Sequence, residues 1–196
     1  VDAFVHTVEQ YLTYPVNAPV QDRFAEGILQ TLIEIGPRLL TAPEPVYDDR
    51  ANLMWAATMA LNGLIGAGVP QDWATHMIGH ELTALYDLDH APTLAIVLPG
   101  MLRVRREGKH AKLLQYAARV WGITSGTEDE RIDAAIARTE AFFEQMGVKT
   151  RLGAYGLKAD AVDAVLAKLE AHRMTKLGER RDVTLEVSRK MLELAL

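Results

Sequence analysis

Two pairs of potential metal ligands stand four residues apart in this sequence. Asp2 and His6 form the first pair, and His76 and His80 form the second. Residues at this spacing share one face of an α-helix, with roughly 5–6 Å between their Cβ atoms, so each pair suits two ligands of one cation. His90 follows His80 across a predicted turn at residues 86–89, which lets the chain fold back and bring His90 near the same point.

The donor atoms of these residues limit the chemistry. The sequence contains no cysteine, so disulfides, thiolate nucleophiles, iron–sulfur clusters and Cys-ligated zinc are excluded. One carboxylate with two or three imidazoles suits Fe(II), Zn(II) or Mn(II), and a divalent ion with an open coordination position can polarise a carbonyl group or activate water. The residues around His76 and His80 are mostly apolar. Imidazoles buried there need partners, and a metal is one such partner.

Other interpretations of the same residues stay open. Histidines four apart also occur as ordinary core or surface pairs, so a non-enzymatic helical scaffold is one alternative. A metal-dependent phosphohydrolase of all-α fold is another, although this chain has Asp89-His90 in the reverse order of the His-Asp dipeptide of those enzymes. A zincin-type metalloprotease is excluded, because Ala84 stands where the second histidine of the motif beginning at His80 must be.

Composition and charge narrow the class of protein further. The 196 residues form one domain or slightly more, and a formal net charge of -5 argues against nucleic acid as a partner. The run of basic residues from Arg103 to Lys112 is typical of a solvated helix face rather than of a specific anion site. No apolar run reaches the roughly 20 residues of a membrane helix, so we expect no membrane association. The lack of cysteine fits a reducing compartment and a cytoplasmic protein.

The spacing of apolar residues indicates the elements that must position these ligands. Apolar residues recur every three or four positions almost throughout, so we predict an all-α, multi-helix fold. The helix at 48–66 has few polar residues on any side, so we expect it to be central and buried. Asp72 is the expected N-cap of the following helix, and Thr127 with Glu130 has capping-box spacing. The predicted helices cover residues 1–12, 20–40 with a break at 36–37, 48–66, 72–86, 90–107, 109–121, 128–146, 158–171 and 182–194.

The sequence opens at Val1 in the middle of a helical pattern, without an initiator Met or the basic segment of a signal peptide. We interpret the chain as a piece of a longer protein.

Several separated motifs follow one another along the chain: Asp2-Ala3-Phe4-Val5-His6, Glu9-Gln10-Tyr11, Asn62-Gly63-Leu64, the run from Trp73 to Leu82, His90 leading into Leu94 to Pro99, and Lys112 to Ala117. In residues and in order they resemble the C-terminal domain of the iron-containing (group III) alcohol dehydrogenases. They are most similar to the branch of NADPH-dependent aldehyde reductases and butanol dehydrogenases, and the resemblance extends to Gly178-Glu179 near the end of the chain.

The resemblance implies a fold, a metal site and a reaction. The implied fold is the one that the iron-containing alcohol dehydrogenases share with dehydroquinate synthase. Residues 1–196 would form the helical, metal-binding domain of that fold. The implied metal ligands are Asp2, His6, His76 and His90, with Fe2+ or Zn2+ as the ion. His80 is implied to lie beside the substrate and nicotinamide in a proton-relay role. The implied reaction is hydride transfer between NAD(P)H and an aldehyde or primary alcohol.

Two departures from the family pattern bear on this expectation. Much of the family has Pro-His-Gly around the last ligand, where this chain has Asp89-His90-Ala91, so the surroundings of His90 differ. The N-terminal dinucleotide-binding domain, which binds most of the NADP(H), is missing from the chain. We therefore expect the chain alone to be inactive and to expose an apolar face. For the intact protein we expect a homodimer. The choice of aldehyde, of iron or zinc, and of NADPH or NADH stays open at this stage.

Overall fold

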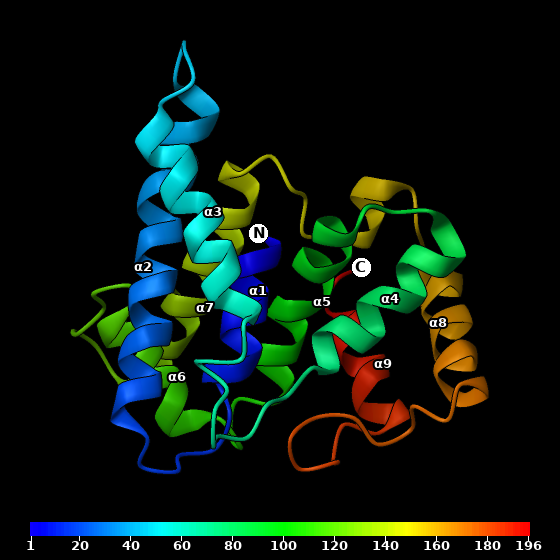
Figure 1. The fold of residues 1–196 in the computed structure, drawn as a ribbon. Helices are drawn as coiled ribbons and strands as arrows, with labels where there is room; N and C mark the ends of the chain where they lie inside the picture. The colour runs from blue at the N-terminus through cyan, green and yellow to red at the C-terminus, as the bar shows by residue number, and fades with distance from the viewer.

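The computed structural model describes all residues from 1 to 196 and is helical, as the apolar spacing predicts (Figure 1). Its only other regular feature is an isolated antiparallel bridge between Leu177 and Val183. The elements in chain order are α1 (Asp2–Tyr11), α2 (Pro19–Thr41), α3 (Tyr47–Leu61), α4 (Ala74–Tyr86), α5 (His90–Val104), α6 (His110–Arg119), α7 (Glu128–Gln145), the short 3-10 helix η1 (Leu152–Tyr155), α8 (Ala159–Ala171) and α9 (Leu185–Glu193).

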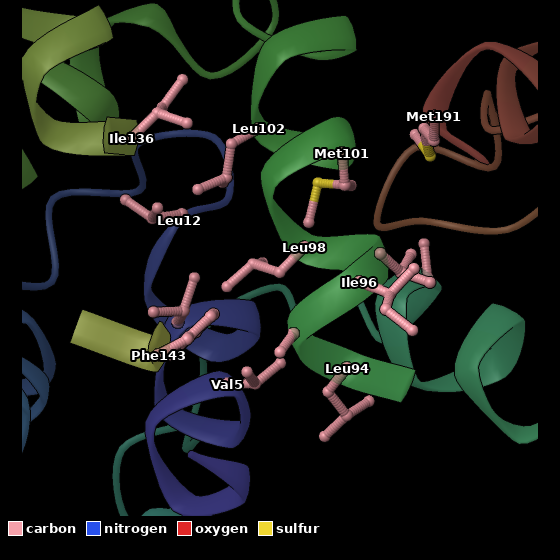
Figure 2. Packing of buried hydrophobic residues seen from close by; sticks show 14 of the residues in the cluster. Val5, Leu12, Leu94, Ile96, Leu98, Met101, Leu102, Ile136, Phe143 and Met191 are labelled. Carbon is pink, nitrogen blue, oxygen red and sulfur yellow. The ribbon is translucent and has the colours of Figure 1, made fainter. Parts of the chain in front are cut away.

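Helix α5 forms the centre of the core. Every residue from 93 to 102 is buried, which is expected of a helix that is apolar on all sides and packed all round. Figure 2 shows its side chains pointing in several directions, with α1 on one side and α9 on another. Gly100 makes the contact with α9 possible, because a Cβ atom at this position would lie 2.3 Å from the backbone oxygen of Met191. The helix carrying the last predicted ligand is thus held rigidly.

The expectation that helix α3 is central and buried is wrong. Only Ala56 and Ala60 of this helix are buried, and Met54 and Trp55 are 74% and 63% exposed. Helices α2 and α3 form an antiparallel pair at one edge of the molecule (Figure 1). A helix that is apolar on every side can lie in a core or can have one side free for another surface, and the sequence pattern does not distinguish the two.

Some predicted helix boundaries also differ from the structure. Helix α2 continues through Gly36 and Pro37 without the predicted break. Helix α4 begins one residue later than expected, with Trp73 as its N-cap, although the Asp72 carboxylate still accepts the N–H of Ala74 at 3.0 Å. The capping box of Thr127 and Glu130 is confirmed, and it begins α7.

No helix of the structure is both long enough and apolar enough to cross a membrane. The basic run is not the solvated helix face that the sequence predicted, because Lys109 and Lys112 are buried. Its arginines pair with carboxylates within the fold. Arg103 pairs with Glu140, Arg105 with Asp182 and Arg106 with Asp133.

Candidate metal centre

The four side chains implied as metal ligands come from three helices that meet near the N-terminus of the chain. Asp2 and His6 lie one turn apart at the start of α1, His76 lies in the first turn of α4, and His90 is the first residue of α5. Helices α4 and α5 pack against each other, and α1 packs against α5. This packing brings together ligands that are far apart in sequence.

The donor atoms of this group are close enough for one ion. One ligand atom from each of the four residues lies within 4.8 Å of the others. Asp2 Oδ1 lies 3.3 Å from His6 Nε2, 3.8 Å from His76 Nε2 and 3.5 Å from His90 Nε2. Bonds of about 2.1 Å at tetrahedral angles place ligand atoms about 3.4 Å apart, so these distances match a single four-coordinate site.

The hydrogen bonding of these residues also fits a cation. Asp2 Oδ1 and His76 Nε2 are buried and form no hydrogen bond within the protein. Buried polar atoms are rarely left without a partner, because the loss of solvent contact costs about 1–3 kcal/mol for each. The two atoms lie 3.8 Å apart, and one divalent ion between them would satisfy both.

The charges around His76 are unusual. Burial by itself lowers the pKa of His76, but the carboxylates of Asp2 and Glu9 outweigh it and raise this pKa to about 9. The close imidazole rings of His6 and then of His76 hold the pKa of Asp2 far below its ordinary value. The centre therefore carries a fixed negative charge on Asp2, which favours binding of a cation. The His76 ring, which the two carboxylates make strongly basic, releases a proton when it binds a metal.

Glu9 is a functional candidate that the spacing of the histidines did not reveal. Its side chain is fully buried, and its carboxylate accepts a hydrogen bond from Nδ1–H of His76. The signal was present in the sequence, since Asp2, His6 and Glu9 are spaced four and then three apart and so share one face of α1. The site therefore extends beyond its four candidate ligands.

His80 lies beside the four-residue centre but is not part of it. Its ring stacks on the ring of His90, with centroids 5.2 Å apart and an angle of 22° between the planes. Burial, and then the nearby His76, lower the pKa of His80, so its ring is mainly neutral at neutral pH. A neutral imidazole at this place can accept a proton at one nitrogen and donate one from the other.

Trp73 forms one wall of the centre. Its ring lies edge to face against His6 and His76, with centroid distances of 5.5 and 5.3 Å. Its backbone has a φ of 61°, a left-handed conformation that is uncommon for a bulky residue and is often found at functional sites. The indole N–H donates to Gln71 Oε1 at 2.8 Å, which fixes the ring.

A second buried charged group supports the loop in front of α4. The Lys109 ammonium is almost fully buried and lies 2.7 Å from Asp72 Oδ2 and 2.8 Å from Glu179 Oε1. It also donates to the carbonyl of Leu12 at 2.6 Å. The N–H of Asp72 donates to the carbonyl of Glu9 in α1 at 3.0 Å. Together with the contacts of Lys109 to Asp72 and to Leu12, this bond ties the loop to the helix that carries Asp2 and His6.

The centre stays accessible on one side. The side chain of Asp2 is 49% exposed and that of His90 is 37% exposed, whereas that of His76 is only 4% exposed. The three cavities of the fold are lined by other residues than these. A substrate can therefore approach Asp2 and His90 from outside, but this chain alone does not enclose it.

Comparison with known proteins identifies a family whose name includes a metal, in agreement with the grouping of Asp2, His6, His76 and His90. Residues 1–193 match the Fe-containing alcohol dehydrogenase family, C-terminal. The chain is 68% identical over 195 residues to the NADPH-dependent aldehyde reductase YqhD of Escherichia coli (strain K12), covering 100% of this chain and 50% of that protein. It is 36% identical over 174 residues to the probable NADH-dependent butanol dehydrogenase 1 of Bacillus subtilis (strain 168), covering 88% of this chain and 45% of that protein.

Solved structures give the same result. The substrate- and cofactor-free form of the E. coli aldehyde reductase YqhD superposes with a TM-score of 0.97 at 67% identity, over 100% of this chain and 51% of that one. The NADH-dependent butanol dehydrogenase A from Thermotoga maritima superposes with a TM-score of 0.90 at 28% identity, over 99% of this chain and 50% of that one. The chain spans about half the length of the relatives it matches. The match over residues 1–193 and the superposition show that this chain belongs to the iron-containing alcohol dehydrogenase family and corresponds to the C-terminal part of its members.

Proposed function

We propose that this chain is the metal-binding half of an NAD(P)H-dependent aldehyde reductase or alcohol dehydrogenase. The observation that carries the proposal is the convergence of Asp2, His6, His76 and His90 on one point, in a chain similar to an NADPH-dependent aldehyde reductase. The other half of the protein would bind most of the NADP(H), and Fe2+ and Zn2+ both suit the nitrogen and oxygen donors present. We propose a homodimer for the intact protein.

The four side chains have distinct tasks in this reaction. They would hold a divalent ion, which would supply Lewis acidity and favour negative charge on the oxygen of an aldehyde. Asp2 supplies the fixed negative charge that retains the ion, and the three imidazoles supply neutral donors. The exposed sides of Asp2 and His90 leave room for the aldehyde oxygen.

His80 is suited to move the proton that completes the reduction. It stacks on the ring of His90 and so lies next to the position of the aldehyde oxygen. We assign it the transfer of a proton from solvent to the product oxygen. Loss of His80 should therefore lower turnover and leave metal binding intact.

The activity can be tested by restoring the rest of the protein. This chain would be fused to the half of E. coli YqhD that it does not match, and NADPH oxidation would be measured with a panel of short-chain aldehydes. We expect oxidation that needs the divalent metal and is lost in His76→Ala. A fusion that folds and binds the metal but oxidises no NADPH with any aldehyde contradicts the proposal.

The two rival functions give different results in the same preparations. A metal-dependent phosphohydrolase would cleave a chromogenic phosphoester without nicotinamide. A scaffold would purify without a metal and would tolerate alanine at Asp2 and His76 with stability changes within about 0.5 kcal/mol.

A further inference from the structure

Glu9 lies at a junction between the helix of the first two candidate ligands and the helix of the third. It belongs to α1 and is fully buried, in contact with the first turn of α4. One carboxylate oxygen, Oε1, accepts the N–H of Thr75 at 2.6 Å. The other, Oε2, accepts the N–H of His76 at 3.3 Å and also contacts Nδ1 of the same residue. A single buried carboxylate thus meets three N–H donors.

These contacts place a hydrogen on Nδ1 of His76. A carboxylate is only an acceptor, so Nδ1 of His76 must carry a hydrogen in order to bond to Glu9. When the ring is neutral, as a metal ligand must be, its lone pair is therefore on Nε2. This is the atom that lies 3.8 Å from Asp2 Oδ1 and has no hydrogen-bond partner. The nitrogen that Glu9 leaves free is therefore the one that faces the candidate ion.

We infer that Glu9 is a positioning residue that selects the tautomer and the orientation of the His76 ring, so that Nε2 is presented to the metal. The inference rests on the proposed metal-dependent function. Carboxylates that orient ligand histidines in this way typically change metal affinity by about 10- to 100-fold when they are removed.

A purely structural role for Glu9 is the main alternative. The N-cap residue of α4, Trp73, forms no side-chain capping hydrogen bond, and the bond from Glu9 to the Thr75 N–H replaces one. The two roles use the two oxygens unequally. Oε1 only caps the helix, whereas Oε2 holds the imidazole and makes a longer, 3.3 Å bond with the His76 N–H. A variant that keeps only one of the two acceptors therefore separates them.

Glu9→Gln is that variant. The amide has the same shape but one acceptor oxygen and one NH2 donor. If the oxygen continues to accept the Thr75 N–H, the NH2 group faces Nδ1 of His76. Nδ1 must then lose its hydrogen, and the proton moves to Nε2, where it blocks the metal. This orientation loses only the longer, 3.3 Å bond from the His76 N–H. The opposite orientation places the NH2 group against the N–H of Thr75 and loses the 2.6 Å bond.

Glu26 offers a matched control. It is also a buried glutamate, at 4% exposure, but it lies on α2 and accepts hydrogen bonds from Tyr11, Gln115 and Arg119. Glu26→Gln removes a buried negative charge away from the metal centre. It should leave the affinity for the metal unchanged.

The experiment titrates the parent chain, Glu9→Gln and Glu26→Gln with Zn2+ and follows folding by circular dichroism. We expect Glu9→Gln to stay helical and to bind Zn2+ about 10- to 100-fold more weakly than the parent, with Glu26→Gln unaffected. Equal affinity of Glu9→Gln and the parent, or equal weakening in both variants, overturns the inference. A parent chain that binds no Zn2+ contradicts the proposed function itself, so the two failures are distinct.

A second measurement does not depend on the variant folding. Long-range 1H–15N NMR spectra of the Zn2+-loaded parent report which nitrogen of His76 carries hydrogen and which binds the metal. We expect the proton on Nδ1 and the metal on Nε2. Coordination of Zn2+ through Nδ1 overturns the inference even if Glu9→Gln cannot be purified.

Discussion

Asp2 and His90 are neighbours, with Oδ1 of the first 3.5 Å from Nε2 of the second, although helices α2, α3 and α4 lie between them in the sequence. Each is the first residue of its helix, and the two helices pack against each other in the core. Helix packing therefore brings the first and last ligands of the candidate centre to one point. Placement of these two residues on opposite sides of the molecule would have contradicted the oxidoreductase interpretation.

Gly100→Ala should destabilise the fold by about 1–3 kcal/mol, because the added methyl group must push α9 away from α5. The new Cβ would meet the Met191 oxygen at 2.3 Å. The measurement is urea unfolding followed by circular dichroism.

Gly27→Ala is the control for Gly100→Ala. Gly27 is also inside a helix, but a Cβ there meets no atom within 4 Å. Alanine should stabilise this position by about 0.5–1 kcal/mol, since it favours the helix over the unfolded chain. If both variants shift stability in the same direction, close packing at Gly100 is not the reason for the effect.

Lys109→Met should cost about 3–5 kcal/mol, because it leaves the buried carboxylates of Asp72 and Glu179 without their shared cation. Lys149→Met is the matched control, since its pair with Glu144 is largely exposed and exposed pairs contribute about 0–1 kcal/mol. Guanidinium unfolding of the two variants compares them directly. Similar losses in both would show that the Lys109 cluster contributes no more than an exposed pair.

Glu144 should make the free energy of unfolding depend on pH in the acid range. Hydrogen bonding to Lys149 holds the pKa of Glu144 below its ordinary value of 4.5, and the N–H and hydroxyl of Thr150 add to the effect. Because the folded-state pKa is the lower one, this stabilisation is present above pH 4.5 and is lost as the pH falls below that value. Glu144→Gln should show a smaller loss of stability between about pH 5 and about pH 3 than the parent. Identical pH profiles would contradict this assignment.

The exposed apolar side of α3 should cause the chain to self-associate. Met54 and Trp55 are 74% and 63% exposed there, and exposed apolar patches of this kind usually mark contact surfaces. Static light scattering should show a mass that rises with concentration, and Trp55→Gln should reduce the rise. Leu194→Gln, at an exposed leucine at the end of α9, should not. A concentration-independent monomer for the parent would contradict the prediction.

The sequence predicted the helices better than their arrangement. Apolar spacing located the helices because each one buries a stripe of its own residues. The capping-box spacing of Thr127 and Glu130 also located the start of α7, because these two residues form the hydrogen bonds that begin the helix. The 3-10 helix η1 was not expected, since a single short turn has no apolar period. The central, buried helix is α5 and not, as predicted, the helix at 48–66. Both helices are apolar all round, and only the packing of the other helices decides which one is enclosed.

The candidate centre was predictable in part for similar reasons. Helical spacing pairs Asp2 with His6, because both lie on one helix. It also pairs His76 with His80, and the structure shows that only His76 joins the group. The resemblance to a family separated the two histidines, whereas spacing did not. The spacing of residues does not reveal the position of Trp73 at the centre, since its left-handed backbone leaves no mark in a pattern of residue types.

The proposed ligand set is tested most directly by Zn2+ titration of His80→Ala and His90→Ala, which measures the stoichiometry and the affinity of binding. The two histidines are stacked neighbours. His90 is assigned as a ligand and His80 is not, although their rings lie 5.2 Å apart. The parent and His80→Ala should each bind one equivalent of Zn2+ with the same affinity, and His90→Ala should bind it far more weakly. If His90→Ala binds one equivalent as tightly as the parent while His80→Ala loses it, the proposed ligand set is wrong.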